Sequence, residues 1–411
     1  MDRDGVFRRP SGTWVAQIEL GLRPAQRCRS CGKGARFWVD REPLEACPNC
    51  GGPLVSTLER RREWQGGFAT KREAVAWRDE HATNVRQGRH VLRRDLSVAD
   101  FLEGEWLPAI RSSVRASTFE SYQLHVRHYI LPEIGHLRLQ ELSPAQLNAL
   151  YAKLQASGSR TGAPLSARTV RLTHVTIRKA LQDALRWGYV VRNVATLANP
   201  PQARRPEMRT WSAEELRRFL DSIGGDRLQA AYWLAASTGM RRGEVLGLRW
   251  SDVDLPAARL QVRQTLVSVG YSPTTSEPKT AKGRRQVPLD ARTVAVLKEH
   301  RRRQLEERLA IGLRASSDLV FTELDGSPIH PDRFTKHFYA LVRAAGLPAI
   351  RLHDLRHSWA TLALQAGVHP KVVQEQLGHS TIAVTMDTYS HVVPAMQREA
   401  VDRVTGAIFG S

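Results

Sequence analysis

The 411-residue sequence has no cysteine outside one short stretch, because all four cysteines lie between Cys28 and Cys50. This sparse use of cysteine is typical of a protein from a reducing cytoplasm. No apolar run is long enough to span a bilayer, which argues against a membrane protein. The first residues, Met1 to Asp4, lack the apolar segment of a secretory signal. Together these absences predict a cytoplasmic protein.

Acidic residues are scarce relative to basic ones. Asp and Glu number 41 against 61 Lys and Arg, which gives a formal net charge of +20 and a sequence pI near 10.6. Such an excess points to a polyanionic partner, and to nucleic acid in particular. The competing interpretation is a generally basic proteome, since the arginines are spread along the chain. The length favours two to four domains, and 42% hydrophobic with 25% charged residues is the composition of a globular protein.

The first 92 residues predict a small module of strands and one helix. Residues 12–20 alternate apolar and polar side chains, which is typical of a strand, and residues 64–68 are a candidate partner strand. Thr70 and Glu73 form a capping-box pattern that opens a helix. Such a unit would have little core of its own.

Two Cys-x-x-Cys pairs lie between these strands. Cys28 with Cys31 and Cys47 with Cys50 are separated by fifteen residues, which is a zinc-ribbon spacing. Two such pairs supply four thiolates for a tetrahedral ion, and an all-cysteine shell leaves no open position for catalysis. We therefore expect a structural zinc ion within residues 28–50. Two disulfides or a redox pair are the alternative.

Residues 95–198 show helical periodicity with apolar inner stripes. Four helices are expected. The first begins at Ser97, the second covers 118–130 and ends at Pro132, the third begins at Ser143, and the fourth covers 166–187. Their outward basic groups could contact phosphates or form a solvated face: Arg111, Arg115, Arg127, Arg168, Arg171, Arg178 and Lys179. Residues 199–206 contain three prolines and are expected to be a linker.

Residues 207–411 begin with two expected helices, after which Gly239 predicts a turn. Arg241 and Glu244 are then spaced to share one face of the next helix. Arg241 is either paired with Glu244 or available to a phosphate, because a buried guanidinium needs an acid or an anion. Residues 259–269 and 284–289 are expected strands, which would place Lys279 near the tip of a hairpin.

The last fifth of the chain gathers groups that could act on a phosphodiester. His353 and Arg356 are three residues apart, a spacing that places both on one helix face. His379 follows Gly378, an expected helix stop, and Tyr389 lies in the next helical stretch. Each of these side chains alone would more often be structural, but together they supply a cation, two imidazoles and a phenol.

Four separated motifs contain these residues, and they follow one another along the chain. They are Thr-Gly-Met-Arg-Arg-Gly-Glu around Arg241, Leu-His-Asp-Leu-Arg-His around His353, Leu-Gly-His-Ser around His379 and Asp-Thr-Tyr-Ser-His around Tyr389. With Lys279 between the first two, the chain resembles the tyrosine recombinases, or phage-type integrases. Upstream, residues 95–198 resemble the family's core-binding domain, and residues 1–92 its arm-type DNA-binding module, from which the cysteine ribbon departs.

The resemblance implies strand exchange through a 3′-phosphotyrosyl intermediate. Tyr389 would attack the phosphate, and it needs assistance because its unperturbed pKa is about 10. Arg241 and Arg356 would clamp the non-bridging oxygens, with Glu244 orienting Arg241. Lys279 would protonate the 5′ oxygen, although Lys282 is close enough to compete. His353 would handle the tyrosine proton as base or acid, and His379 would donate to a non-bridging oxygen.

The predicted fold is α+β and multidomain. It comprises a small zinc-containing β-rich module (1–92), an all-α core-binding domain (95–198), a linker (199–206) and a mainly α catalytic domain with a small antiparallel sheet (207–411). The resemblance implies neither a catalytic metal nor ATP, and no Walker motif is present.

The implied partners are double-stranded DNA attachment sites, three further protomers in a homotetramer, a directionality factor and a host DNA-bending protein. The implied location is the cytoplasm of a bacterium, in association with the nucleoid. Two alternatives remain open: a type IB topoisomerase-like activity, and a catalytically inactive zinc-containing DNA-binding regulator.

Overall fold

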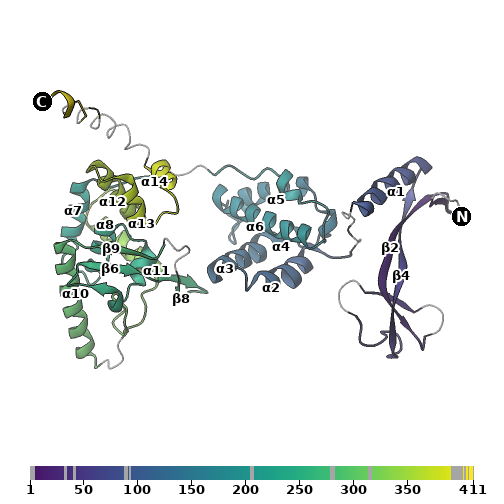
Figure 1. Cartoon of the computed structure of the whole chain (residues 1–411), viewed down its shortest axis with the longest axis horizontal. Helices are drawn as coiled ribbons and strands as arrows, with labels where there is room; N and C mark the ends of the chain where they lie inside the picture. The colour runs from purple at the N-terminus through teal and green to yellow at the C-terminus, as the bar shows by residue number, and fades with distance from the viewer. Residues whose placement is uncertain are drawn as a thin grey trace. The chain divides into compact units, whose positions relative to one another are not determined.

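The computed structural model describes residues 5–31, 35–39, 43–87, 91, 94–203, 208–277, 283–312, 317–389, 401, 404–405 and 407–410. The chain divides into two compact units, one of Met1–Ile110 with Leu124–Gln202 and one of Arg111–Gln123 with Ala203–Ser411. Helices and strands are both present, and helices predominate (Figure 1). None of the helices in the described ranges is both long enough and apolar enough to cross a membrane.

The N-terminal sheet is built on one long strand. β2 (Trp14–Cys28) pairs antiparallel with β4 (Leu54–Phe68) along its length, and its other edge pairs with β1 (Val6–Arg8) and β3 (Arg36–Trp38). Both predicted strands are present, but each is 15 residues long. They are longer than predicted because β2 and β4 stay paired even at residues 22–24, where every β2 side chain is exposed; the register shifts between Glu19 and Leu22.

The helix α1 (Lys71–Arg86) begins at the predicted capping box. The Thr70 hydroxyl accepts a hydrogen bond from the Glu73 amide at 3.2 Å, and the Glu73 carboxylate accepts one from the Thr70 amide at 3.3 Å. The helix buries Ala74 against Val6 and Ala16. This core is as small as the sequence predicts.

The segment 95–198 is helical. Its elements are η1 (Asp100–Trp106), which continues into α2 (Leu107–Ile110), α3 (Ala116–His125), η2 (Val126–Ile130), α4 (Leu131–Ile134), η3 (Leu139–Glu141), α5 (Pro144–Ser157), α6 (Ala167–Arg186) and η4 (Val194–Leu197). Asp183 is buried, and it accepts hydrogen bonds from the Trp106 indole at 2.9 Å and from the Lys179 ammonium at 2.7 Å. Lys179 therefore forms an ion pair with Asp183, one turn further along the same helix.

The helix expected at 118–130 does not stop at Pro132. The wide helical turn η2 follows α3, and α4 then continues through Pro132 to Ile134. Because Pro132 lies in the first turn of α4, its missing N–H would have no helical partner there in any case. The prediction of a stop at Pro132 was wrong for this reason.

The second unit is organised around the buried helix α8 (Gln229–Thr238), which packs against α7 (Ala213–Ser222), α10 (Ala291–Ala310) and α12 (Asp354–Gln365). The remaining helices are α9 (Arg242–Leu246), η5 (Trp250–Asp252), α11 (Pro331–Ala344), α13 (Pro370–Leu377) and α14 (Ile382–Thr388). An aromatic cluster completes the core, and it contains Trp211, Phe219, Tyr232, Phe334 and Phe338.

The strands of this unit correct one sequence prediction. Residues 259–269 form two strands, β6 (Arg259–Val262) and β7 (Thr265–Val269). β6 pairs with β5 (Val253–Asp254) and β9 (Arg285–Pro288), whereas β7 forms a separate hairpin with β8 (Ser272–Ser276) that turns at Gly270 and Tyr271. The expected pairing of residues 259–269 with 284–289 is present between β6 and β9, and the β7–β8 hairpin is inserted between these two strands. Lys279 and Lys282 themselves lie outside the described residues.

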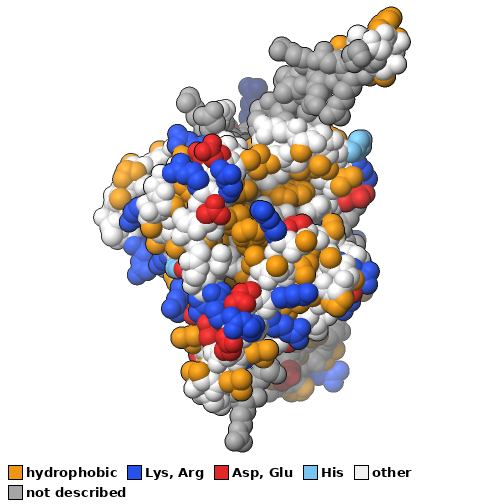
Figure 2. Space-filling view, turned by 90° about the vertical axis from the view of Figure 1, so that its left-hand side faces the viewer, with side chains coloured by type: hydrophobic (Ala, Val, Ile, Leu, Met, Phe, Trp, Pro, Cys, Tyr) orange, Lys and Arg blue, Asp and Glu red, His pale blue; other side chains and the backbone are white. Residues whose placement is uncertain are grey.

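One side of the molecule carries charges of both signs. Figure 2 shows acidic and basic side chains interspersed among apolar ones on this face. Charges of both signs are also paired along α10, where Arg302 forms ion pairs with Glu299 and Glu306. This face therefore lacks the uniformly positive surface that a DNA backbone favours.

Candidate active site

Two helix ends bring the predicted motifs together. Gly239 ends α8 and Gly378 ends α13, both in the left-handed conformation, with φ of 68° and 66°. Gly239 has no room for a side chain, because a Cβ there would lie 2.8 Å from Leu377 and 2.9 Å from Trp359. The turn at Gly239 and the helix stop at Gly378 were predicted, and the structure brings the α8–α9 turn, the start of α12 and the α13–α14 turn together at one place.

Arg356 lies at the centre of this meeting point and is 2% exposed. Its guanidinium donates to the Gly239 carbonyl at 2.8 Å and to the Leu377 carbonyl at 2.7 Å. Burial, reinforced by the nearby Arg241, lowers the pKa of Arg356 to about 9. A buried guanidinium held by two neutral carbonyls attracts anions strongly, because no carboxylate among the described residues is bonded to it.

Arg241 and Glu244 resolve one alternative left open by the sequence. Arg241 is the N-cap of α9, and its guanidinium donates to Glu244 at 2.8 Å and to the Gly378 carbonyl at 3.3 Å. The Glu244 carboxylate also accepts hydrogen bonds from Arg285 at 3.1 and 2.8 Å. The Arg241 side chain remains 40% exposed, so its pairing with Glu244 leaves part of the guanidinium open to an anion.

Glu244 is buried between the two arginines. Burial raises the pKa of its carboxyl group, but the hydrogen bonds and charge of Arg285, together with the charge of Arg241, outweigh burial and lower it to about 2. Glu244 is therefore ionised at neutral pH, and it joins α9 to β9. Arg285, which is 7% exposed, also donates to the Gln376 carbonyl on α13. Sequence reasoning missed Arg285, although it lies only three residues from Lys282.

Glu244→Gln is expected to lower stability by about 3 kcal/mol, because it leaves Arg285 buried without its countercharge. Since the folded pKa of Glu244 is depressed, its contribution is complete above the unfolded value of 4.5 and is lost as the pH falls towards about 2. Urea unfolding between pH 2.5 and 7 should show that the difference from wild type shrinks with acid. The control Asp332→Asn affects an exposed pair with Arg242 and should cost no more than about 1 kcal/mol. Equal effects of the two substitutions at pH 7 would contradict this account.

The two predicted histidines occupy different environments. His353 precedes α12 and its side chain is exposed, whereas His379 is half-buried and its Nδ1 lies 2.8 Å from the Thr385 hydroxyl. Burial and the charges of Arg356 and Arg241 lower the pKa of His379 to about 3. Partial desolvation of its imidazole ring, with the charges of His357, Arg356 and Arg241, lowers the pKa of His353 to about 4, although the residue as a whole is exposed. Both imidazoles are therefore neutral at pH 7 in the absence of an anion.

Tyr389 directly follows α14 rather than lying inside it, and it is fully buried. Its ring packs in a cluster with Ala360, Leu364, Val373 and Leu377. Burial raises the pKa of its hydroxyl to about 12, although the charge of Arg356 acts in the opposite direction. The phenol is therefore neutral at pH 7.

The hydroxyl of Tyr389 lies 2.9 Å from Nδ1 of His357. Sequence reasoning did not single out His357, although its i+4 spacing from His353 would have placed both on one helix face. The rings of His353 and His357 are 4.9 Å apart and perpendicular. The structure thus brings Arg241, Arg356, His379 and Tyr389 together and adds His357, with His353 at the exposed rim.

A cleft of about 740 Å³ opens beside Arg285. Its basic lining consists of Arg249, Arg263, Arg284 and Arg285, and Glu277 is the one acid among its lining residues in the described part of the chain. Gln261, Gln264 and Gln286 add amide groups. The cleft thus continues along β6 and β9, and its four arginines are paired with Asp252, Glu277 or Glu244.

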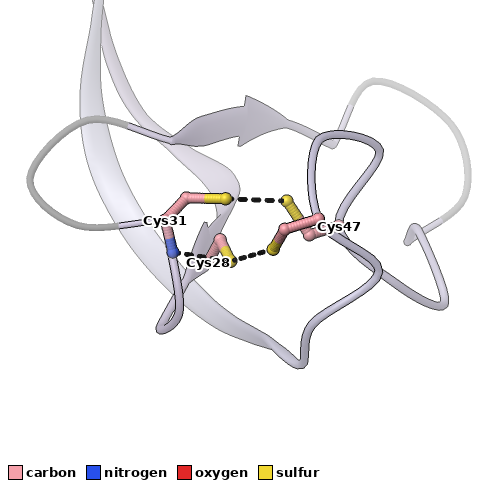
Figure 3. A group of neighbouring side chains, drawn as sticks. Cys28, Cys31 and Cys47 are labelled. Atoms are coloured by element: carbon pink, nitrogen blue, oxygen red, sulfur yellow. Dashed lines mark hydrogen bonds between the residues drawn. The ribbon is translucent and has the colours of Figure 1, made fainter.

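The four cysteines form a separate cluster where β2 ends and β4 begins (Figure 3). Their sulfur atoms all lie within 4.8 Å of one another, with 3.5 Å between Cys28 and Cys50 and 3.7 Å between Cys31 and Cys47. A tetrahedral zinc site with Zn–S bonds of about 2.3 Å has sulfur separations of about 3.8 Å. The cluster fits that geometry, and the amides of Ser30 and Cys31 each point at the Cys28 sulfur at 3.3 Å.

Comparison with known proteins identifies the family. Residues 209–396 match the phage integrase family, and residues 98–155 match the N-terminal SAM-like domain of phage integrases. A tyrosine recombinase XerC-like protein of Caldanaerobacter subterraneus is 31% identical over 362 residues, covering 83% of this chain and 90% of that protein. The ICEBs1 integrase of Bacillus subtilis is 26% identical over 282 residues, covering 68% and 74%.

Solved structures show the same fold. The Tn1549 transposon integrase in complex with transposon right end DNA has a TM-score of 0.62 at 20% identity, covering 75% of this chain and all of that one. A lambda integrase tetramer bound to a Holliday junction has a TM-score of 0.52 at 14% identity, covering 92% and 96%. The chain belongs to the phage integrase family, the tyrosine-type site-specific DNA recombinases, and is a DNA strand transferase. The inactive-regulator and topoisomerase alternatives receive no support.

Proposed function

We propose that this integrase cleaves DNA by attack of Tyr389 on the scissile phosphate, which forms a 3′-phosphotyrosyl link, and that it integrates or excises a mobile element. The observation that carries the proposal is the convergence of Tyr389, Arg356 and Arg241 from three separated motifs onto one buried cluster. A nucleophile placed near Arg356, whose guanidinium is held by two neutral carbonyls, and Arg241, which is still 40% exposed, suits a reaction in which negative charge builds up on phosphorus.

Each positively charged or imidazole group has a proposed part in the reaction. Arg241 and Arg356 neutralise the non-bridging oxygens, and His379 donates a hydrogen bond to one of them. Lys279 protonates the departing 5′ oxygen, with Lys282 as its competitor; both lie outside the described residues. His353, which is exposed in the absence of DNA, takes part in handling the tyrosine proton as base or acid. Because these groups supply the charge stabilisation and the ester link conserves the bond energy, the reaction requires no catalytic metal and no ATP.

The experiment that tests this function uses a nicked suicide substrate, from which the short cleaved strand diffuses away. The wild-type protein is expected to accumulate a protein–DNA adduct that survives denaturant. A mobility shift without an adduct would instead favour a non-catalytic DNA-binding regulator. Relaxation of supercoiled DNA without strand exchange would favour topoisomerase-like action.

The upstream segments have proposed DNA-binding roles. Residues 95–198 form the core-binding domain and residues 1–92 the arm-type module, joined to the catalytic domain (207–411) through the linker 199–206. The exposed Arg168, Arg171 and Arg178 on α6 support phosphate contact by the core-binding domain. The DNA-bound Tn1549 and lambda integrases support double-stranded attachment sites and a homotetramer as partners. A directionality factor, a host DNA-bending protein and a place at the bacterial nucleoid in the cytoplasm complete the proposal.

We further propose that Cys28, Cys31, Cys47 and Cys50 hold a structural zinc ion. The sulfur separations support a tetrahedral ion, and four cysteine ligands leave no position for a substrate. The ion would close the end of the β2–β4 ribbon, where few apolar side chains are buried. When bound, the ion would hold together the two loops that carry the cysteine pairs.

Purified protein is expected to contain about one zinc ion per chain, because one four-thiolate cluster is present. Elemental analysis combined with titration of free thiols measures this ratio. Cys28→Ser should lose the metal, whereas Ser30→Ala, which leaves every sulfur in place, should retain it. Metal-free protein with four reactive thiols, or with two disulfides by mass spectrometry, would remove the zinc assignment.

A further inference from the structure

The contact between His357 and Tyr389 is the strongest feature that the expected catalytic set leaves unexplained. Nδ1 of His357 lies 2.9 Å from the Tyr389 hydroxyl, and in the described part of the chain this is the hydroxyl's one hydrogen bond. A general base must lie about 2.6–3.2 Å from the proton that it removes. His357 meets this requirement before any DNA is bound.

His353 does not occupy an equivalent place. It precedes α12 and is exposed, its ring packs perpendicular to that of His357, and the charges of Arg356 and Arg241 act on it. His357 lies one helical turn further on and faces the buried cluster that holds the tyrosine ring. Within the described residues, His357 is therefore the imidazole that contacts the nucleophile.

We propose that His357 is the general base that accepts the proton of Tyr389 during strand cleavage, an inference that rests on the proposed function of Tyr389. In this step the phenolic O–H proton moves to Nδ1 of His357, an Oη–P bond forms, and the P–O5′ bond breaks. The 5′ oxygen takes its proton from Lys279 or Lys282. On rejoining, the imidazolium of His357 returns its proton to Oη as the 5′ hydroxyl attacks.

The surroundings of His357 suit this role. Burial lowers its pKa, so the imidazole is neutral and can accept a proton at neutral pH. Asp354, one turn earlier on α12, favours the imidazolium that forms, whereas two arginines oppose it. The charged and titratable groups that face His357 are Arg351, His353, Asp354, Arg356, His379 and Tyr389.

A role limited to holding Tyr389 in place is the alternative, and His357→Asn separates the two. Asparagine retains a hydrogen-bonding atom close to the place of Nδ1, but it cannot carry a proton at neutral pH. The matched control is His369→Asn, because His369 is an exposed N-cap residue of α13 and asparagine is also a good N-cap. Mobility shifts check that each variant still binds DNA.

Single-turnover cleavage of the nicked substrate is measured from pH 5.5 to 9. Wild-type protein is expected to reach a plateau at or below about pH 6.5, the ordinary pKa of histidine. His357→Asn is expected to be slower by about 10² or more and to gain about tenfold per pH unit, because hydroxide must then remove the proton. A rate within threefold of wild type with an unchanged pH profile would overturn the proposal, as would a slow variant that keeps the wild-type plateau.

A substrate with sulfur at the bridging 5′ position sharpens the test, because a thiolate leaves without a proton. It should restore cleavage to a variant that lacks the leaving-group acid, but not to His357→Asn. Wild-type protein on this substrate provides a readout that needs no variant: its cleavage rate should rise to a plateau with an apparent pKa below 6.5. A continuous rise to pH 9 would overturn the proposal. Failure of the wild type to form any adduct would instead remove the proposed function itself.

Discussion

Tyr389→Phe is expected to abolish the covalent protein–DNA adduct while leaving DNA binding intact. The substitution removes the attacking oxygen and retains the ring, which is fully buried among Ala360, Leu364, Val373 and Leu377. The loss in stability should stay near about 1 kcal/mol, because one hydrogen bond, to His357, disappears. The readout is a denaturing gel of the nicked substrate after incubation with each protein.

Tyr339→Phe is the matched control for this result. It removes the same atom from a tyrosine on α11 that is 42% exposed and lies away from the buried cluster around Tyr389. This control should form the adduct at the wild-type rate. An adduct that persists in Tyr389→Phe would show that another residue is the nucleophile.

Arg356→Lys is expected to reduce cleavage by about 10²–10³, the usual effect of losing one donor to a developing oxyanion. The guanidinium of Arg356 donates to two carbonyls from different segments, Gly239 and Leu377, while its charge is directed at the site. A lysine can place its ammonium near one carbonyl, but it cannot make the forked contact. The other carbonyl would lose its partner in a buried place, which costs about 1–3 kcal/mol.

A loss of stability must be separated from a loss of catalysis in this variant. Circular dichroism and DNA mobility shifts at the assay temperature confirm that the protein is folded and bound, and the rate is then compared under saturating protein. Arg242→Lys is the control, because Arg242 adjoins Arg241 but pairs with exposed groups on α11. Arg241→Lys should behave like Arg356→Lys in rate, with a smaller loss of stability because its side chain is 40% exposed. Near-normal cleavage by Arg356→Lys would show that Arg356 only joins α8 to α13 and does not contribute to catalysis.

Local signals in the sequence predicted several helix starts and stops. The Thr70–Glu73 capping box opens α1, and the helix expected at Ser143 is α5. Such signals act within four residues, because the groups that satisfy a helix end are its immediate neighbours in the chain. They remain readable whatever the rest of the fold does.

Strand pairing was predicted less well. The division of residues 259–269 into β6 and β7 depends on which partner each half meets, and those partners lie further along the chain. The length of β2 and β4 likewise follows from their mutual hydrogen bonds rather than from burial. Alternation of side chains reports only the buried face, so strands exposed on both faces leave no pattern.

The order and chemical types of the residues determined the family, the four motifs, the turns at Gly239 and Gly378, and the spacing of the cysteines, because all of these are local or compositional. The folded chain alone decided that Glu244 is shared by Arg241 and Arg285, and that Tyr389 meets His357 rather than His353. The Glu244–Arg285 and Tyr389–His357 contacts join residues 41 and 32 positions apart. Only packing of α12, α13 and β9 selects them, since many side chains of the right type could pair at such separations.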